Sequence, residues 1–208
     1  VKLMVGHTMH YLPASRKVKQ LIAEGSLGEL VMIHDVRHAD YFTDARLPWS
    51  FEKSKAGGGI LYNLGSHSVD KIQWMTESKV KSIRSSLSYK EPKRGDIEGG
   101  GIIFLETESG IPATITQSGY KGVGRNETEY IFTHGMIKQG SRVFISRNKE
   151  YVEVELEPQQ SPLALQILDL LASIEKNQDP ECSGKYARSV IQAIEAVYES
   201  DRQRAEIS

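Results

Sequence analysis

The 208-residue sequence contains one cysteine, Cys182, and no long apolar run. A single thiol excludes an internal disulfide and suits a reducing compartment, so the sequence predicts a cytoplasmic protein. No apolar stretch approaches the roughly 18 residues that a membrane-spanning helix needs. The formal net charge is only −1. Because no basic stripe with interleaved aromatic residues is present, neither nucleic acid nor a membrane is expected as a partner.

The sequence also lacks the short motifs of nucleotide-binding and acyl-transfer enzymes. It contains no G-x-G-x-x-G and no G-x-x-x-x-G-K-[ST], which excludes a Rossmann phosphate site in this chain. It contains no G-x-S-x-G, and Cys182 has no evident histidine partner.

No metal site is expected either. His34 and His38 would lie about 13 Å apart along one strand, too far for a single zinc ion. His7 and His10 form a pair in a loop, but no third ligand is in sight.

Hydrophobic patterning predicts a mixture of strands and helices. Strands are expected at Val1–Val5 and 30–41, with a helix over Ala14–Glu24 between them. A second helix is expected over about 60–76. Short runs joined by tight turns then predict a meander of antiparallel strands at 79–90, 101–107, 111–120, 129–133, 136–139, 142–146 and 151–156.

Two further helices close the chain, one after Ser161-Pro162 and one over about 184–204. In the first of them an apolar stripe is expected at Leu163, Ile167, Leu170, Leu171 and Ile174.

These elements predict one α+β domain over residues 1–208, with an open, mainly antiparallel sheet and helices packed on one face. Too few helices remain to cover the other face, so that face is expected to bind another copy of the chain. The chain starts without methionine in an expected strand, and we interpret it as part of a longer protein.

The stretch from Lys55 to Asp70 carries the best candidate chemistry. Gly57–Gly59 allow the backbone to approach a ligand closely and lead directly into a helix. Asn63 and His67 follow four residues apart, which places both side chains on one helix face. An imidazole with a pKa near 6.5 suits general acid–base catalysis, although a histidine on an amphipathic helix is more often structural.

This stretch resembles the central motif of the glucose–fructose oxidoreductase/inositol dehydrogenase/MocA family, G-G-G-x-L-x-D-x-G-x-H-x-x-D. Segments 6–13, 24–29 and 196–200 are similar to other family segments, in the same order. The resemblance covers nearly the whole chain. It implies the C-terminal substrate-binding and oligomerisation domain of a two-domain NAD(P)-dependent oxidoreductase, without the N-terminal Rossmann domain.

The resemblance implies that His67 is the catalytic histidine, which exchanges a proton with a substrate hydroxyl as hydride moves to or from the nicotinamide. Asn63 stands where most members have aspartate. An amide can hold a substrate hydroxyl, but it cannot accept a proton. His10 replaces the usual arginine, which removes a fixed positive charge.

The expected substrate-binding residues are therefore Asn63, His10, Tyr11, Trp49 and Gly58, although Tyr11 and Trp49 suit core or hinge positions equally well. The expected substrate is a sugar, an inositol or a nucleotide sugar. NAD or NADP would be bound mainly by the missing domain, so the chain alone is expected to be inactive. It should form a homodimer or homotetramer through the open sheet face.

Two alternatives stay open. One is a family member that uses NAD transiently to cleave a glycoside. The other is a non-catalytic binding or assembly domain, which the departures at Asn63 and His10 would suit.

Overall fold

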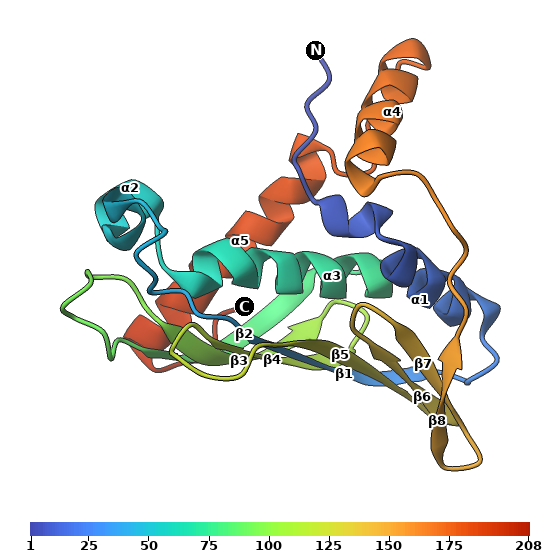
Figure 1. Ribbon diagram of the computed structural model, residues 1–208, viewed down its shortest axis with the longest axis horizontal. Coiled ribbons are helices and arrows are strands. Elements are labelled where there is room, and N and C mark those ends of the chain that lie inside the picture. The colour runs from blue at the N-terminus through green and yellow to red at the C-terminus, as the bar shows by residue number, and fades with distance from the viewer.

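In the computed structural model, which describes residues 1–208, the chain forms one eight-stranded sheet with helices over one face (Figure 1). The strands lie in the order β2-β3-β4-β1-β5-β6-β7-β8. Their bounds are β1 Leu30–His38, β2 Val80–Ser88, β3 Gly100–Thr107, β4 Pro112–Ser118, β5 Arg125–Phe132, β6 Gly135–Gln139, β7 Val143–Arg147 and β8 Glu150–Val154. Only β1 and β4 run parallel; every other neighbouring pair is antiparallel. The predicted α+β class and open sheet are confirmed.

The helices are α1 Pro13–Glu24, α2 Lys53–Ala56, α3 Ser66–Thr76, α4 Pro162–Glu175 and α5 Gly184–Gln203. Shorter turns are η1 Thr8–Tyr11 and η2 Pro48–Phe51, both 3₁₀, and the π-helical segment η3 Leu61–Gly65. Pro13 opens α1, and Gly25 ends it in the left-handed conformation at φ 66°. No helix combines the length and the apolar character that crossing a membrane requires.

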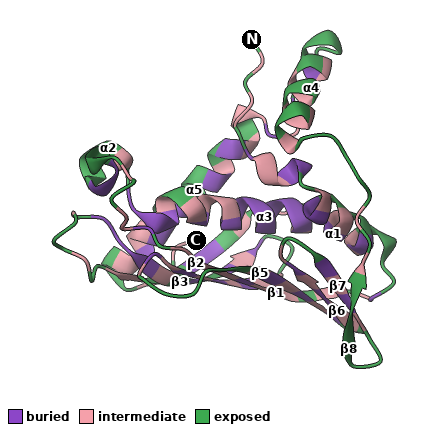
Figure 2. Ribbon diagram, viewed as in Figure 1, coloured by how far each residue is buried: buried purple, intermediate pink, exposed green.

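The core lies between the sheet and the helices α1, α3 and α5 (Figures 1 and 2). Alternate strand residues point into it, and those on the sheet side include Ile33, Ile103, Ile115, Tyr130 and Ile137, all fully buried. The helices contribute Val69, Ile72, Val190, Ile194 and Val197. Since side chains alternate along a strand, every second residue faces the helices. Many of those positions are apolar, and burying them against the helices stabilises the fold.

The opposite face of the sheet is not covered by any helix of the chain (Figure 1). On β3, Ile102 and Phe104 point away from the helices and are 58% and 43% exposed, whereas their neighbours Ile103 and Leu105 are fully buried. This uncovered face agrees with the expectation from the sequence, and self-association through it stays a prediction.

Two sequence-based expectations are wrong. Val1–Val5 is not a strand: Met4 makes one isolated bridge with Ser183, because no strand lies beside this segment. The meander is also interrupted, since β1 is inserted between β4 and β5.

The apolar stripe of α4 is largely exposed and does not pack on the sheet. Leu163, Ile167, Leu171 and Ile174 are all at least half exposed, and Ser173 is the only buried residue of this helix. The reason is the position of α4, which projects from the body and contacts η1 instead of the sheet (Figures 1 and 2).

Candidate active site

The glycine turn before η3 is shaped by contacts within the protein. Gly57 has φ 81°, which only glycine adopts easily. A Cβ on Gly58 would lie 2.0 Å from the Tyr198 hydroxyl oxygen, and one on Gly59 would lie 1.9 Å from the Glu98 carbonyl oxygen. The close approach expected toward a ligand is therefore, at Gly58 and Gly59, an approach to other parts of the chain.

Glu98 holds this turn in place. Its fully buried carboxylate accepts hydrogen bonds from the backbone N–H groups of Gly59, at 2.8 Å, and Leu61, at 2.9 Å. These are orphan donors at the start of a helix, where a negative charge is also favoured. Because Glu98 already occupies the helix N-terminus after the three glycines, this turn cannot serve as a phosphate site of the kind found in dinucleotide-binding folds.

The helical turn between the glycines and His67 is π-helical, η3, rather than the plain α-helix expected over 60–76. Single π turns in helices are frequent at functional sites. Asn63 and His67, on either side of its end, both border one hollow of about 590 Å³. We call it the His67 hollow; it is lined by Leu3, Val5, Gly6, His7, Tyr41, Arg46, Trp49, Ser50, Ala56, Gly58, Tyr62, Asn63, Ser66, His67, Gly184, Ala187, Arg188 and Ile191.

His67 is held as a neutral imidazole. Burial lowers its pKa below the usual value, and the nearby positive charge of Arg37 lowers it further, against the opposing effect of Asp70. Its Nδ1 is buried and has no hydrogen-bond partner. The ring of His7 meets it edge-on, with 6.3 Å between the ring centroids. A neutral imidazole in a hollow can accept a proton at neutral pH.

Asn63 lies in a polar chain beside His67. Its side-chain amide donates to the Tyr41 hydroxyl at 3.4 Å, and that hydroxyl donates to the Gly59 carbonyl at 3.4 Å. The guanidinium of Arg46 lies 3.7 Å from the centre of the Tyr41 ring. Its Nε is buried without a hydrogen-bond partner. Asn63 and Arg46 thus offer hydrogen-bond donors to the hollow.

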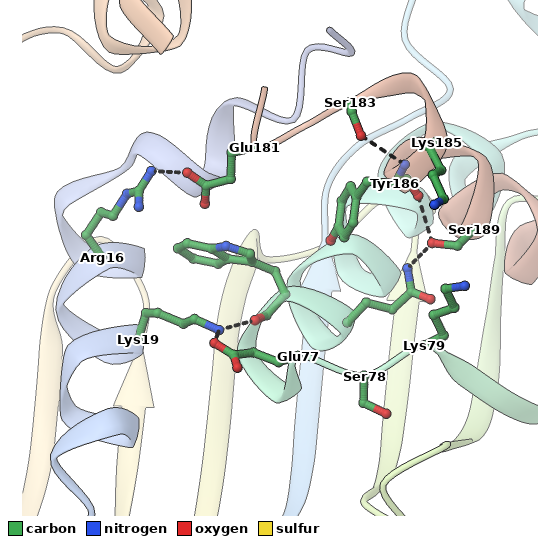
Figure 3. A pocket seen from close by; sticks show the side chains of 12 residues that line it. Arg16, Lys19, Glu77, Ser78, Lys79, Glu181, Ser183, Lys185, Tyr186 and Ser189 are labelled. Carbon is green, nitrogen blue, oxygen red and sulfur yellow. Dashed lines mark hydrogen bonds and ion pairs between the residues drawn. The ribbon is translucent and has the colours of Figure 1, made fainter. Parts of the chain in front are cut away.

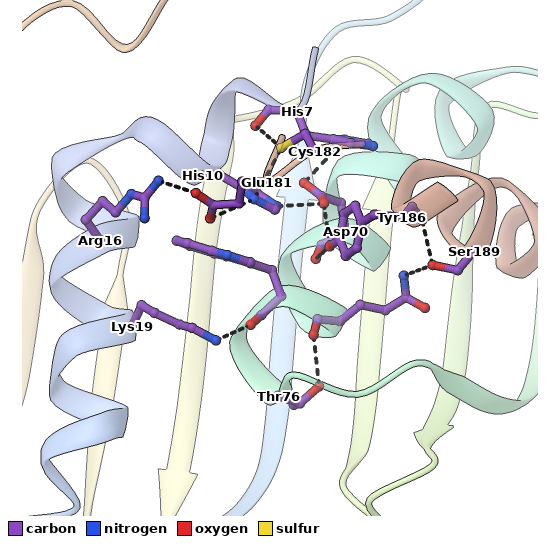
Figure 4. Close-up of polar contacts among 12 residues, drawn as sticks. His7, His10, Arg16, Lys19, Asp70, Thr76, Glu181, Cys182, Tyr186 and Ser189 are labelled. Atoms are coloured by element: carbon purple, nitrogen blue, oxygen red, sulfur yellow. Dashed lines mark hydrogen bonds and ion pairs between the residues drawn. The ribbon is translucent and has the colours of Figure 1, made fainter. Parts of the chain in front are cut away.

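His10 lies outside the His67 hollow, in a buried cluster around Asp70 (Figure 4). Its Nε2 is 2.8 Å from Asp70 Oδ1, and its ring stacks on Trp74 with 4.3 Å between centroids. Nδ1 lies 3.3 Å from both Cys182 Sγ and a Glu181 carboxylate oxygen. Although burial opposes it, hydrogen bonding to these three groups raises the pKa of His10 to about 11.

The expectation that His10 removes a positive charge is therefore wrong. His10 is charged at neutral pH because its neighbours are anionic, and it stands at the motif position where the family usually has arginine. Its location gives it a structural contact with Asp70 and no surface in the hollow.

The other three candidates separate in the same way. Tyr11 is buried, and its hydroxyl donates to Asp169 at 2.8 Å, so it occupies the core position that the sequence left open. Trp49 is 49% exposed and lines the His67 hollow, as does Gly58. The structure therefore brings together Asn63, His67, Trp49 and Gly58, but not His10 or Tyr11.

Asp70 contacts both a residue of the His67 hollow and a residue of a second hollow (Figures 3 and 4). His7, in the His67 hollow, has its Nδ1 3.3 Å from Asp70 Oδ2, and neither atom makes a hydrogen bond. On the other side the Tyr186 hydroxyl donates to Asp70 Oδ1 at 2.8 Å. Tyr186 lines this second hollow, of about 610 Å³, which we call the Trp74 hollow; its other lining residues are Arg16, Lys19, Gln73, Trp74, Glu77, Ser78, Lys79, Glu181, Ser183, Lys185 and Ser189.

No group of three His, Cys, Asp or Glu side chains is placed to hold a metal ion. His34, one of the histidines considered for that role, has its Nδ1 2.8 Å from the Thr114 hydroxyl on the neighbouring strand.

Sequence reasoning missed Tyr41, Arg46, Arg188 and Glu98. The first three border the His67 hollow from the loop before η2 and from α5, and Glu98 anchors the glycine turn from the segment before β3. None of them shares a local motif with His67. Only the acidic residue next to a second glycine cluster, Glu98-Gly99, offered any signal, and it was not specific.

The fold is that of the C-terminal domains of oxidoreductases. An aldose-aldose oxidoreductase from Caulobacter crescentus, solved with glycerol, aligns with 100% of this chain and 64% of its own, at a TM-score of 0.88 and 19% identity. A levoglucosan dehydrogenase solved with NADH and L-sorbose aligns with 100% of this chain and 66% of its own, at a TM-score of 0.86 and 17% identity. At such identities the likeness establishes the fold alone.

The family follows from the sequence comparison. The family model of the GFO/IDH/MocA C-terminal domain matches residues 15–138, more than half of the chain. A 1-carboxy-3-chloro-3,4-dihydroxycyclo hexa-1,5-diene dehydrogenase from Comamonas testosteroni is 27% identical over 125 residues, which are 60% of this chain and 31% of that protein. The chain belongs to the GFO/IDH/MocA family, as its motifs indicated. Its curated relatives include dehydrogenases and a reductase, and also a 2,7-anhydro-N-acetylneuraminate hydratase from Escherichia coli, 28% identical over 118 residues. The match spans about a third of the length of the Comamonas testosteroni relative.

Proposed function

We propose that residues 1–208 are the substrate-binding and oligomerisation domain of an NAD(P)-dependent oxidoreductase. The substrate would be a secondary alcohol of a sugar, an inositol or a nucleotide sugar. One observation carries this proposal: a neutral histidine, His67, stands at the family's motif position and borders a hollow of about 590 Å³. That volume lies within the range of small-molecule sites.

The proton chemistry follows from the state of His67. In alcohol oxidation its imidazole takes the hydroxyl proton, and in carbonyl reduction it returns one. Asn63 donates a hydrogen bond to a neighbouring substrate oxygen and so orients the carbon that reacts. Since Asn63 carries no charge, the imidazolium that forms is stabilised less at this position than it would be beside an aspartate.

The redox partner would be held mainly by a separate domain, because Glu98 closes the helix N-terminus that follows the three glycines. A nicotinamide held by that separate domain would accept hydride from the substrate carbon that carries the hydroxyl. Two features support such a domain over the rim of the His67 hollow. Leu3 and Val5 of the N-terminal segment form part of that rim, and α4 exposes an apolar surface on the same side of the molecule (Figure 1).

Self-association would use the uncovered sheet face. The exposed Ile102 and Phe104 on this face support the proposal, because apolar side chains gathered on an uncovered sheet are typical of an interface. A second copy there would bury both residues. The result would be a homodimer or, with a further contact, a homotetramer.

Replacement of His67 in the intact protein tests the proposed function. We expect His67→Ala to lower kcat by about 10²–10⁴-fold while the affinity for the nicotinamide cofactor changes little. His134→Gln, at an exposed histidine in the turn between β5 and β6, is the matched control and should retain full turnover. Full activity of His67→Ala would remove this residue from the catalytic role. Absence of any NAD(P)-linked turnover by the intact protein would favour a binding or assembly domain.

A further inference from the structure

The His67 hollow is positively charged and contains no carboxylate among its 18 lining residues. Two arginines, Arg46 and Arg188, line it from different elements, the loop before η2 and helix α5. Its two histidines are neutral, because burial lowers the pKa of both His7 and His67. The walls therefore carry two positive charges and no negative charge.

Neither arginine has an ionic partner within the protein. Arg46 and Arg188 are not among the arginines that form ion pairs. Arg46 is held in position by the Tyr41 ring, 3.7 Å away, yet its buried Nε makes no hydrogen bond. A buried donor without an acceptor is unfavourable, so this guanidinium is prepared for a ligand oxygen.

Two acidic groups lie behind the walls, and each has polar partners within the protein. Asp70, behind His7, is 2.8 Å from the charged His10 and accepts a hydrogen bond from Tyr186. Glu98, behind the glycine turn, accepts two backbone hydrogen bonds. Arg37 lies close enough to His67 to lower the pKa of its imidazole, which adds positive potential on that side.

We infer that the substrate of this hollow is an anionic polyhydroxy compound, a sugar or cyclitol that carries a carboxylate or a phosphate. Arg46 and Arg188 bind the anionic group, since a guanidinium offers paired N–H donors that match either oxyanion. Asn63 and His67 then contact the hydroxyls. This inference deepens the proposed function and rests on it for the identity of the hollow as the substrate site.

The Trp74 hollow provides a comparison within the same chain. It contains four basic side chains, but Arg16 is paired with Glu181 at 2.6 Å and Lys19 with Glu77 at 2.8 Å (Figure 3). Both carboxylates lie in its wall, so an anionic ligand there would meet like charges. The His67 hollow presents cations alone.

Equilibrium binding to three probes tests the inference. Glucuronate carries a carboxylate, glucose 6-phosphate carries a phosphate, and glucose is the neutral match. We expect at least one anionic probe to bind about tenfold or more tightly than glucose, because a hydrogen bond between charged groups contributes roughly 1.5–3 kcal/mol. Raising the salt concentration should weaken binding of the anion and not of glucose. The probe that binds identifies the anionic group.

Variants assign the effect to the two arginines. Arg188→Gln and Arg46→Gln should each remove most of the preference for the anion, and Arg46→Lys should lose part of it because lysine lacks the planar fork. Arg147→Gln, at an exposed arginine on β7 without an ion pair, should change nothing. Since Arg188 is exposed, its replacement leaves the fold intact even if Arg46→Gln perturbs the Tyr41 contact.

Several outcomes would overturn the inference. Equal affinity for glucose and both anions would do so, as would full anion preference in both glutamine variants. Weaker binding of NAD(P) with unchanged binding of the anions would show that the arginines serve the cofactor. Turnover measurements distinguish failure of the anion inference from failure of the proposed function. Oxidation of glucose as efficiently as glucuronate would refute only the inference of an anionic substrate. Anion binding without NAD(P)-linked turnover would refute only the proposed dehydrogenase function.

Discussion

The two hollows have nearly the same volume, about 590 and 610 Å³, and Asp70 lies between them. Their chemistry is different. The Trp74 hollow is bordered by ion pairs, such as Arg16 with Glu181, in which both partners are satisfied. The His67 hollow is bordered by side chains with unused donors or acceptors, among them Nδ1 of His67 and Nε of Arg46.

The difference teaches that unsatisfied polar groups, rather than volume, mark a site prepared for a ligand. Native proteins pair nearly all of their buried polar atoms, so several buried polar atoms without hydrogen bonds in one hollow need an explanation. A ligand with several hydroxyls would satisfy them. His10 and His67 have opposite charge states because His10 is hydrogen-bonded to Asp70 and Glu181, whereas burial and the charge of Arg37 outweigh the effect of Asp70 on His67.

The largest effect is expected from removing the contact between His10 and Asp70, the residue that lies between the two hollows. His10→Leu leaves Asp70 buried beside an apolar group, with the Tyr186 hydroxyl as its one side-chain hydrogen-bond partner and the neutral His7 3.3 Å away. We expect a loss of about 3–5 kcal/mol in the free energy of unfolding, measured by urea denaturation. The exposed control His134→Gln should stay within about 0.5 kcal/mol of the parent protein. A loss below about 1 kcal/mol for His10→Leu would mean that the cluster is not an ion pair.

The charge of His10 also predicts a dependence of stability on pH. Its pKa is raised from 6.5 to about 11 in the folded state. Its contribution to stability is therefore complete below about pH 6.5 and is lost as the pH rises toward 11. Between pH 7.5 and 9.5 we expect a loss of about 2.7 kcal/mol in the difference between the free energies of unfolding of the parent protein and His10→Leu, measured by urea denaturation at each pH. Parallel curves for the two proteins would contradict a charged His10.

The lowered pKa of His67 acts in the opposite direction. The unfolded chain binds a proton near pH 6.5 and the folded His67 does not, so this residue removes stability as the pH falls through that region. The pH profile thus reports His10 above neutrality, and the buried His7 and His67 below it.

A smaller effect is expected from the turn that shapes the His67 hollow. Gly59→Ala would place a Cβ 1.9 Å from the Glu98 carbonyl oxygen, and a backbone atom cannot move aside easily. We expect a loss of about 1–3 kcal/mol in stability together with reduced turnover. Gly122→Ala, where a Cβ would meet nothing within 4 Å, is the matched control and should be neutral. Equal stability of the two variants would show that the turn can accommodate a Cβ at position 59.

The smallest effect is expected in the Trp74 hollow. Lys79→Gln and Lys185→Gln change two of its basic side chains that form no ion pair, and we expect less than a twofold change in kcat/KM. A tenfold loss in steady-state assays would instead place substrate in this hollow and reverse the comparison.

Local patterns predicted much of the fold. Proline at the start of α1 and glycine after it located that helix within one residue. β-Branched residues, alternation and tight turns indicated a strand overlapping each of β1 to β8. The position of β1 in the sheet could not be predicted, because its partners β4 and β5 are distant in sequence. The exposed α4 was also missed, since an apolar stripe does not reveal what covers it.

The candidate site was predictable in part, because some of its residues lie in one local motif and others come from distant segments. His67 and Asn63 lie within one motif, so spacing was sufficient to place them together. Glu98, Arg46 and Arg188 reach the same region from separate elements, and only the folded chain brings them there. The charge of His10 was missed because it depends on Asp70 and Glu181, which are distant in sequence.

The insertion of β1 between β4 and β5 has a consequence for the order of folding. Strands β2–β4 and β5–β8 are two arrays of sequential hairpins, and they pair with one another only through β1. The ribosome makes β1 before either array, yet it gains both neighbours only after residue 132 has been added. Because such distant pairings form slowly, we expect the two arrays to form early and the docking of β1 to be the late step that makes unfolding of the sheet cooperative.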